Sequence, residues 1–241
     1  ASPAFADTVV IHAGHVITDA ARPAAGASTI TVTDGKIVSI ADGYADAPAG
    51  ARVVELRDKT VLPGLIDLHV HLESNPGGDF RDEAVITDDY AALVGAHNAL
   101  ITVKAGFTTV RDLGSAPRGG FALRDATAKG LIPGPRIVSS GPAISIIGGH
   151  GDVSGYRPEV NAALDGKNTC TGADQCAARV REASKNGADV IKITATGGVR
   201  LSARIRETKP HDPAAPKGEP EKRETVVVEW EVSDNGVGIA P

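Results

Sequence analysis

The positions of apolar residues divide the chain into two regions with different periods. Across Thr8–Leu62, short runs alternate between apolar and polar residues, and this period of two predicts β-strands. Asp34 and Gly35 separate two of these runs, where an Asp-Gly pair favours a hairpin turn. His12 and His15 fall on the strands, and we interpret them as surface residues or as satisfied core residues. The first region is therefore expected to be β-sheet.

After residue 64 the pattern changes to strands that alternate with helices, which is typical of βα units on a parallel sheet. Strands are expected at residues 61–72, 108–114, 136–140 and around Lys192. The first helix is expected at about Asp88–Ala105, with Gly106 in the position that ends it. Its residues at helical spacing form one apolar stripe for packing: Tyr90, Leu93, Val94, His97, Leu100 and Ile101.

Two features of this region have a functional and a structural interpretation. Residues 141–172 show no clear period, and irregular loops of that length are more often functional than idle. The run Gly148–Asp152 makes His150 a candidate for contact with a substrate, and a plain loop histidine is the alternative. Arg111 and Asp112 are interpreted as an internal ion pair, with a supporting role at a site as the alternative.

Composition limits the class of protein. With 241 residues and 41% hydrophobic side chains, the chain can bury a sizeable core. A net charge of −5 without a dense Lys/Arg stripe argues against nucleic acid or an anionic membrane surface as partner. No apolar run reaches the ~18 residues that a membrane-spanning helix needs.

The first residues and the two cysteines indicate in which cellular compartment the protein is expected. Ala4 and Ala6 resemble the cleavage end of a secretory signal, so we expect a periplasmic or secreted protein, with a cytoplasmic one as the alternative. Cys170 and Cys176 are close enough in sequence for a local disulfide in an oxidising compartment. Two unpaired thiols are the other interpretation.

The most informative pattern is the pair His69 and His71 in the apolar run Val61–Leu72. A strand turns residues two apart to the same face, so both imidazoles should point at one spot. Asp67 shares that face, and its carboxylate is suited to orient an imidazole through its N–H. Two neutral imidazoles backed by a carboxylate suit a borderline metal such as zinc. We predict a metal site here, on a strand that its apolar residues should bury.

The run around these histidines resembles the first barrel strand of the amidohydrolase superfamily of metal-dependent hydrolases. Gly187–Val199 is similar to the fourth strand in the branch with imidazolonepropionase-like proteins and Xaa-Pro dipeptidases. The resemblance implies that Lys192 is carboxylated and bridges two metals, as a ligand beside His69 and His71. A neutral lysine amine takes up carbon dioxide to become an oxygen donor, and burial favours the neutral amine. A lysine whose head reaches solvent is the alternative.

The resemblance implies an α/β fold: a partial TIM-like (β/α) barrel with an N-terminal β-sandwich segment and an irregular C-terminal tail that ends in a strand. The implied reaction is hydrolysis of an amide or peptide-like C–N bond in a dipeptide-like or N-acyl amino acid substrate. One or two Zn²⁺ ions, or another divalent metal, would activate the attacking hydroxide.

Four βα units are counted where a closed barrel has eight. The resemblance also implies two further histidines and an aspartate from later strands, and no position here matches them. We therefore leave open an incomplete enzyme, a non-catalytic fragment, and a homo-oligomer that supplies the missing half.

The end of the chain has a different character. Asp234–Ile239 resembles the adenine-binding box of histidine-kinase-type ATPases, and Gly197–Arg206 resembles the strand before that box. This implies a chimeric or truncated chain after about Val199, with an ATP-binding module around Asp234 as an alternative function. A strand at Thr225–Val232 that completes the sandwich is the other interpretation. The expected segments are 1–6 (signal remnant or disordered), 7–62 (sandwich), 63–199 (partial barrel), 200–224 (mobile linker) and 225–241 (strand and tail).

Overall fold

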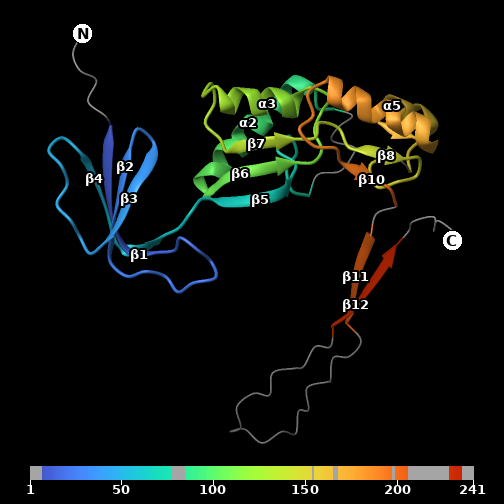
Figure 1. Ribbon diagram of the computed structural model, residues 1–241. Coiled ribbons are helices and arrows are strands. Elements are labelled where there is room, and N and C mark those ends of the chain that lie inside the picture. Colours follow the sequence, from blue (N-terminus) through green and yellow to red (C-terminus); the bar gives the residue numbers. More distant parts are fainter. Residues whose placement is uncertain are drawn as a thin grey trace, which may run out of the picture. The chain divides into compact units, whose positions relative to one another are not determined.

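Figure 1 shows the computed structural model of the chain. The structure describes residues 7–77, 85–153, 155–164, 168–196, 199–205 and 228–234, the last two segments by their backbone alone. Contacts divide the chain into two compact units, Ala1–Leu65 and Ile66–Pro241. Within the described residues, no helix has the length and apolar character needed to cross a membrane.

The first unit contains one four-stranded sheet in the order β3-β2-β1-β4. β1 runs antiparallel to β2 and parallel to β4. The described residues give this sheet alone, so the second layer of the expected sandwich is not observed. The strands are β1 (Thr8–Val16), β2 (Ser28–Thr33), β3 (Lys36–Asp42) and β4 (Arg52–Val61).

The hairpin predicted from Asp34 and Gly35 is confirmed. These residues connect β2 to the antiparallel β3 with φ angles of 50° and 74°. Both angles are positive, as a two-residue turn of the favoured hand requires. Behind the hairpin, a small core packs Ala13, Val16 and Ile30.

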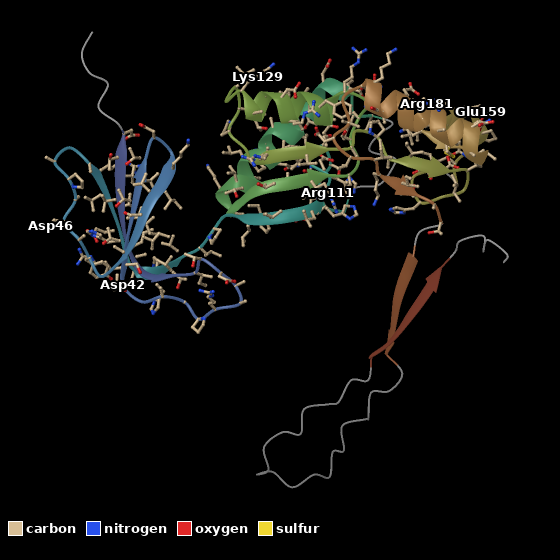
Figure 2. All side chains as sticks on the ribbon, viewed as in Figure 1. Asp42, Asp46, Arg111, Lys129, Glu159 and Arg181 are labelled. Atoms are coloured by element: carbon tan, nitrogen blue, oxygen red, sulfur yellow. A yellow bond between two sulfur atoms is a disulfide. The ribbon has the colours of Figure 1, made fainter. Side chains whose placement is uncertain are left out.

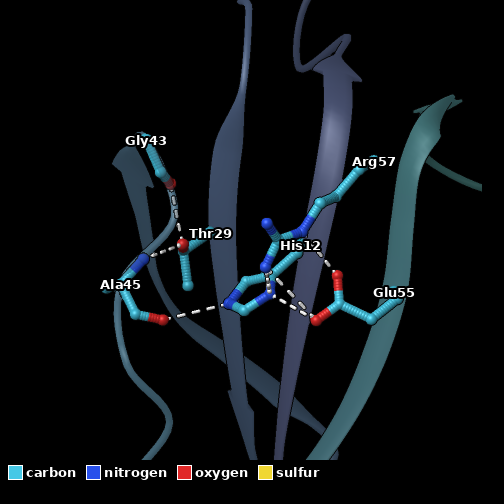
Figure 3. Close-up of polar contacts among 6 residues, drawn as sticks. All are labelled: His12, Thr29, Gly43, Ala45, Glu55 and Arg57. Carbon is cyan, nitrogen blue, oxygen red and sulfur yellow. Dashed lines mark hydrogen bonds and ion pairs between the residues drawn. The ribbon is translucent and has the colours of Figure 1, made fainter.

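His12 on β1 is a buried histidine whose two ring nitrogens both have partners (Figure 3). Its Nδ1 lies 2.9 Å from Glu55 Oε1, and its Nε2 lies 3.0 Å from the carbonyl oxygen of Ala45. Arg57 bonds the same carboxylate at 2.7 Å and lies over the ring of Tyr44. The interpretation of His12 as a satisfied core residue is confirmed.

The second unit begins with a three-stranded sheet in the order β5-β6-β7, in which β6 and β7 are parallel. Two helices lie over one face of this sheet (Figure 1). Between helices and sheet is a core of Leu72, Ala99, Val110, Leu123 and Ile137. The predicted βα alternation is thus observed, with β5 (Leu65–Val70), α2 (Asp88–Lys104), β6 (Phe107–Asp112), α3 (Gly119–Ala128) and β7 (Arg136–Ser139).

The burial expected for β5 is wrong over most of the strand. Leu65, Ile66 and Leu68 keep 43%, 61% and 56% of their surface exposed. β5 is the edge strand of its sheet, and only Val70 and Leu72 at its carboxyl end reach the core. Apolar residues on both faces of a parallel strand normally meet further layers, and no described element covers this edge.

The segment 141–172, expected to be an irregular loop, contains short regular elements. β8 lies between β9 and β10 in a second sheet, with parallel pairing on both sides. Within the described residues the two three-stranded sheets of this unit do not close into a barrel. The elements are β8 (Ile144–Ile146), α4 (Pro158–Leu164), β9 (Thr169–Cys170), α5 (Gly172–Lys185) and β10 (Ile193–Thr194).

Two links hold this second sheet in place. The backbone N–H of Asp189 donates to the Ser139 carbonyl at 2.9 Å, and its carboxylate accepts the Ser139 N–H at 2.9 Å and Arg124 Nη1 at 3.0 Å. Asp189 thereby ties the segment before β10 to β7 and α3. A disulfide between Cys170 and Cys176 ties β9 to α5, which decides between the two interpretations of the cysteines.

The last described elements are β11 (Val199–Ile205) and β12 (Val228–Asp234), which pair antiparallel. β11 occupies the first residues of the segment expected to be a linker. β12 pairs with β11, and the interpretation in which the tail completes the sandwich stays a prediction. Residues 235–239 of the predicted adenine box lie outside the described residues.

Candidate metal site

His69 and His71 lie side by side at the carboxyl end of β5. Their ring centroids are 5.3 Å apart with an interplanar angle of 64°. Val70 and Leu72 point the other way, into the core under α2 and α3. The alternation of a strand therefore brings both imidazoles to the face that the helices leave open, as the spacing predicted.

The imidazole of His71 is held by the loop that follows β6. Its Nδ1 lies 3.0 Å from the carbonyl oxygen of Gly114, so Nδ1 carries the proton and donates it. A Cβ at Gly114 would lie 2.8 Å from His71 Cε1, so this close approach requires glycine. In the neutral ring with this tautomer, the lone pair of Nε2 is available to a metal.

The surroundings of His69 favour its neutral form. Burial of part of the imidazole lowers its pKa, and the positive charges of Lys192 and Arg111, with that of His71 when it is protonated, lower it further. The Asp67 carboxylate opposes this shift in pKa. Since a metal ligand must be the neutral imidazole, these effects favour coordination by His69 near neutral pH.

Asp67 does not orient a histidine ring as predicted. Its Oδ1 accepts the backbone N–H of His69 at 2.9 Å. A side chain can bond the backbone two residues on more easily than it can reach a ring on the same extended strand. Asp67 therefore shapes the strand and not the imidazole.

Lys192 lies directly before β10, partly buried, and its carbonyl oxygen accepts the Ile144 N–H at 2.9 Å. Its charge acts on His69, so the ends of β5 and β10 bring these two predicted ligands into one electrostatic neighbourhood. The loop with His150 lies on the carboxyl end of β10. The N–H of His150 donates to the Thr196 carbonyl at 2.9 Å, and the Gly151 N–H to Thr194 Oγ1 at 3.2 Å. The imidazole of His150 is exposed.

The predicted ion pair between Arg111 and Asp112 is wrong, because successive strand residues point to opposite faces. Arg111 lies on the face away from the helices (Figure 2), and its Nε donates to the Leu68 carbonyl at 2.8 Å. Asp112 is fully buried on the helix side. Its Oδ2 accepts the Leu72 N–H at 3.3 Å and its Oδ1 the Gly114 N–H at 3.2 Å. Burial raises the pKa of Asp112, and these two N–H groups lower it.

Sequence reasoning missed Glu73, two residues after His71. Its Oε2 accepts the Ala116 N–H at 2.7 Å, and its buried Oε1 has no partner among the described residues. Burial raises the pKa of Glu73 to about 7, with smaller contributions from the charges of Asp112 and Asp88. The sequence contained one signal for it, a single carboxylate two residues after the histidine pair.

The residue types fit a divalent metal, but the ligand set is incomplete. Two neutral imidazoles near a lysine that can become an oxygen donor suit zinc or a similar ion. In the part of the chain that the structure describes, no three His, Cys, Asp or Glu side chains gather closely enough to hold a metal ion. The described His, Cys, Asp and Glu side chains therefore do not make up a complete ligand set.

A profile of the amidohydrolase family matches residues 60–214, which contain His69, His71 and Lys192. The chain belongs to the amidohydrolase family. Ochratoxinase from Aspergillus niger is 30% identical to it over 221 residues, which are 83% of this chain and 44% of that protein. A dihydroorotase from Anaeromyxobacter sp. (strain K) is 38% identical over 96 residues, 40% of this chain and 21% of that protein.

Solved structures are similar in fold over about four fifths of this chain. A Xaa-Pro dipeptidase with bound methionine gives a TM-score of 0.70 at 33% identity, over 80% of this chain and 48% of that one. A prolidase in complex with N-methylphosphonate-L-proline gives 0.65 at 31% identity, over 79% and 47%. The chain thus spans less than half the length of each of these relatives, which are hydrolases of the amidohydrolase type.

Proposed function

We propose that this chain carries the first metal-binding half of an amidohydrolase that cleaves an amide or peptide-like C–N bond in a small substrate. The observation that carries the proposal is the His69–His71 pair on the open face, with the charge of Lys192 acting on it. A bound divalent metal would supply an activated water and would polarise the scissile carbonyl.

His69 and His71 would bind the metal as neutral imidazoles. The lowered pKa of His69 reduces competition from protons, and the bond from His71 Nδ1 to Gly114 holds the second ring before metal arrives. A pre-oriented ligand loses less conformational entropy when it binds. The two histidines differ in this respect, since the structure gives a ring hydrogen bond to His71.

Lys192 would act as a carbamate. Its neutral amine would form an N–C bond to carbon dioxide while one C=O electron pair moves to oxygen and the amine proton leaves to solvent. The product is an anionic oxygen donor that can bridge two metals. Partial burial of Lys192, its position directly before β10, and the effect of its charge on the pKa of His69 support this role.

A dipeptide-like or N-acyl amino acid substrate agrees best with the relatives, among which are a Xaa-Pro dipeptidase and a prolidase. His150 would contact that substrate, because its loop lies on the carboxyl end of the strand that follows Lys192. An exposed imidazole in a glycine-rich loop can donate to a substrate carbonyl or carboxylate.

A second chain and an oxidising compartment are part of the proposal. The exposed apolar residues of β5 would be covered by another copy or by a complementary half. A periplasmic or secreted location agrees with the Cys170–Cys176 disulfide, since disulfides persist in oxidising compartments.

Metal binding by the purified chain tests the proposal. Metal-free protein is titrated with Zn²⁺ and with Co²⁺, whose visible absorption reports its ligand geometry, and bound metal is counted by elemental analysis. His69→Asn and His71→Asn should each weaken binding by at least about tenfold, by analogy with the losses seen when a ligand is merely misoriented. His97→Asn, at an exposed histidine on α2, is the matched control and should bind like wild type.

Bicarbonate separates the role of Lys192 from that of the histidines. Added bicarbonate should tighten metal binding by wild type and leave Lys192→Gln unaffected. Equal metal binding by wild type and by a His69→Asn, His71→Asn double variant would refute the proposed site.

A further inference from the structure

The loops that follow β5 and β6 are joined by a set of hydrogen bonds around His71. The Leu113 N–H donates to the Val70 carbonyl at 3.1 Å, which continues the strand pairing past the end of β6. Beyond it, the ring of His71 reaches the Gly114 carbonyl. On the other side, Asn98 of α2 donates to the Leu72 carbonyl at 2.8 Å. The backbone on both sides of His71 is therefore fixed.

Asp112 lies at the centre of these contacts. One carboxylate oxygen accepts the N–H of Leu72, the residue after His71, and the other accepts the N–H of Gly114, whose carbonyl binds the His71 ring. Both oxygens are thus used on the two loops that frame one imidazole. Asp112 has no exposed surface, so each missing bond would leave a buried polar group unpaired.

The close approach of Gly114 to the His71 imidazole restricts where the ring can lie. The His71 ring is so close to Gly114 that a Cβ there would lie 2.9 Å from Nδ1. A small rotation of Gly114 would therefore remove the bond to Nδ1 or push the ring away. Because Asp112 fixes the N–H of Gly114, it limits that rotation.

We propose that Asp112 is a positioning residue, which holds His71 in the Nδ1–H tautomer with Nε2 free on the open face through its bonds to Leu72 and Gly114. The metal role of Nε2 rests on the proposed function, but the tautomer is a property of the metal-free chain. The carboxylate thus acts through the backbone of two loops, and not by touching the imidazole.

The first test is made on the wild-type chain. With ¹⁵N-labelled histidine in metal-free protein at about pH 8, where an ordinary imidazole is neutral, two-bond ¹⁵N–¹H spectra distinguish the tautomers. His71 should be in the Nδ1–H form. An Nε2–H form, or an even mixture, would overturn the inference without any variant.

Asp112→Asn tests the cause. The amide has the same shape, but one oxygen acceptor becomes an NH₂ donor that faces a backbone N–H. In a folded variant with an unchanged circular dichroism spectrum, the His71 tautomers should become mixed and Zn²⁺ affinity should fall about 10- to 100-fold. Asp89→Asn, an exposed carboxylate at the start of α2, should change neither. A folded Asp112→Asn chain with a wild-type tautomer would overturn the inference.

A measurement on wild type decides the case in which Asp112→Asn does not fold. Scalar couplings across hydrogen bonds should connect the amide nitrogens of Leu72 and Gly114 to the carboxyl carbon of Asp112, and their absence would overturn the inference. Failure of the proposed function looks different. In that case the tautomer of His71 would still change in Asp112→Asn, but neither wild type nor the variant would bind metal.

Discussion

Glu73 is a buried carboxylate with one unused oxygen, and replacing it with glutamine should stabilise the chain at neutral and higher pH. In the folded state its pKa is raised to about 7, against 4.5 for an ordinary glutamate, chiefly by burial. Between these two values the folded chain holds a proton that the unfolded chain has lost. The free energy of unfolding therefore falls as pH rises from about 4.5 to about 7, and the full loss is present above that window.

The size of the effect follows from the gap between the two pKa values. At about 1.4 kcal/mol per pH unit, the gap from 4.5 to about 7 corresponds to about 3.4 kcal/mol. Solvent reaches part of this carboxyl group and screens it, so we expect about 1–2 kcal/mol. Glu73→Gln keeps an oxygen that can accept the Ala116 N–H and removes the charge beside Gly119.

Urea unfolding of the metal-free chain, followed by circular dichroism at 222 nm, measures this effect. The described helices all lie in the second unit, so the signal reports the unfolding of the unit that contains Glu73. The difference between Glu73→Gln and wild type should be near zero at about pH 4.5 and reach about 1–2 kcal/mol at about pH 8. Glu159→Gln, an exposed carboxylate on α4, should stay within about 0.5 kcal/mol throughout.

The difference in the free energy of unfolding between Glu73→Gln and wild type should depend on pH in this way. A difference that is constant with pH, or that increases toward acidic pH, would refute this account of the buried carboxyl group. A variant that is less stable than wild type at about pH 8 would also refute it, because the charge would then be favourable in the fold.

Two further predictions concern the links of the second sheet. Cys170→Ser together with Cys176→Ser should lower the free energy of unfolding by about 2 kcal/mol, as expected for a short closed loop, and a reductant should bring wild type to the same value. Unchanged urea midpoints would contradict this. Asp189→Asn should cost about 1–2 kcal/mol by weakening the bonds to Ser139 and Arg124, and a loss below about 0.3 kcal/mol would contradict the role of that link.

The sequence was sufficient where structure depends on neighbours in the chain. Thr87 accepts the N–H of Tyr90 and Gly106 follows with φ 97°, so both ends of α2 were predictable from local residues. The pairing of His69 with His71 follows from strand alternation alone.

Burial was predicted less well, because it depends on which layers are present. The apolar stripe of α2 was expected to pack, yet Tyr90, Leu93 and Ile101 are 58%, 69% and 51% exposed. The helix instead packs through Gly95 and Ala99, small residues that allow close approach to the elements beside them. Periodicity identified the helix, but it could not tell which of its faces has a neighbour.

The interactions that shape the candidate site join positions about 40 residues apart, so no local pattern contained them. Asp112, Gly114 and Glu73 matter because β5 and β6 are adjacent strands whose loops meet at one edge. A sequence pattern found the two imidazoles, but the strand pairing decides which of their nitrogens is free.

The orientation of His71 depends on the pairing of β5 and β6, and both strands are present in this chain, although it spans less than half the length of its relatives. The contacts that orient His71 all lie within residues 70–114, inside one sheet and the helix packed on it. The edge of β5 that pairs with no described strand lies outside that set. The orientation of His71 should therefore survive without the remaining strands of a barrel, while metal affinity should stay weak until further ligands arrive. If His71 were ordered only after metal and a second chain were both added, the site would be formed by assembly and not by the β5–β6 pairing.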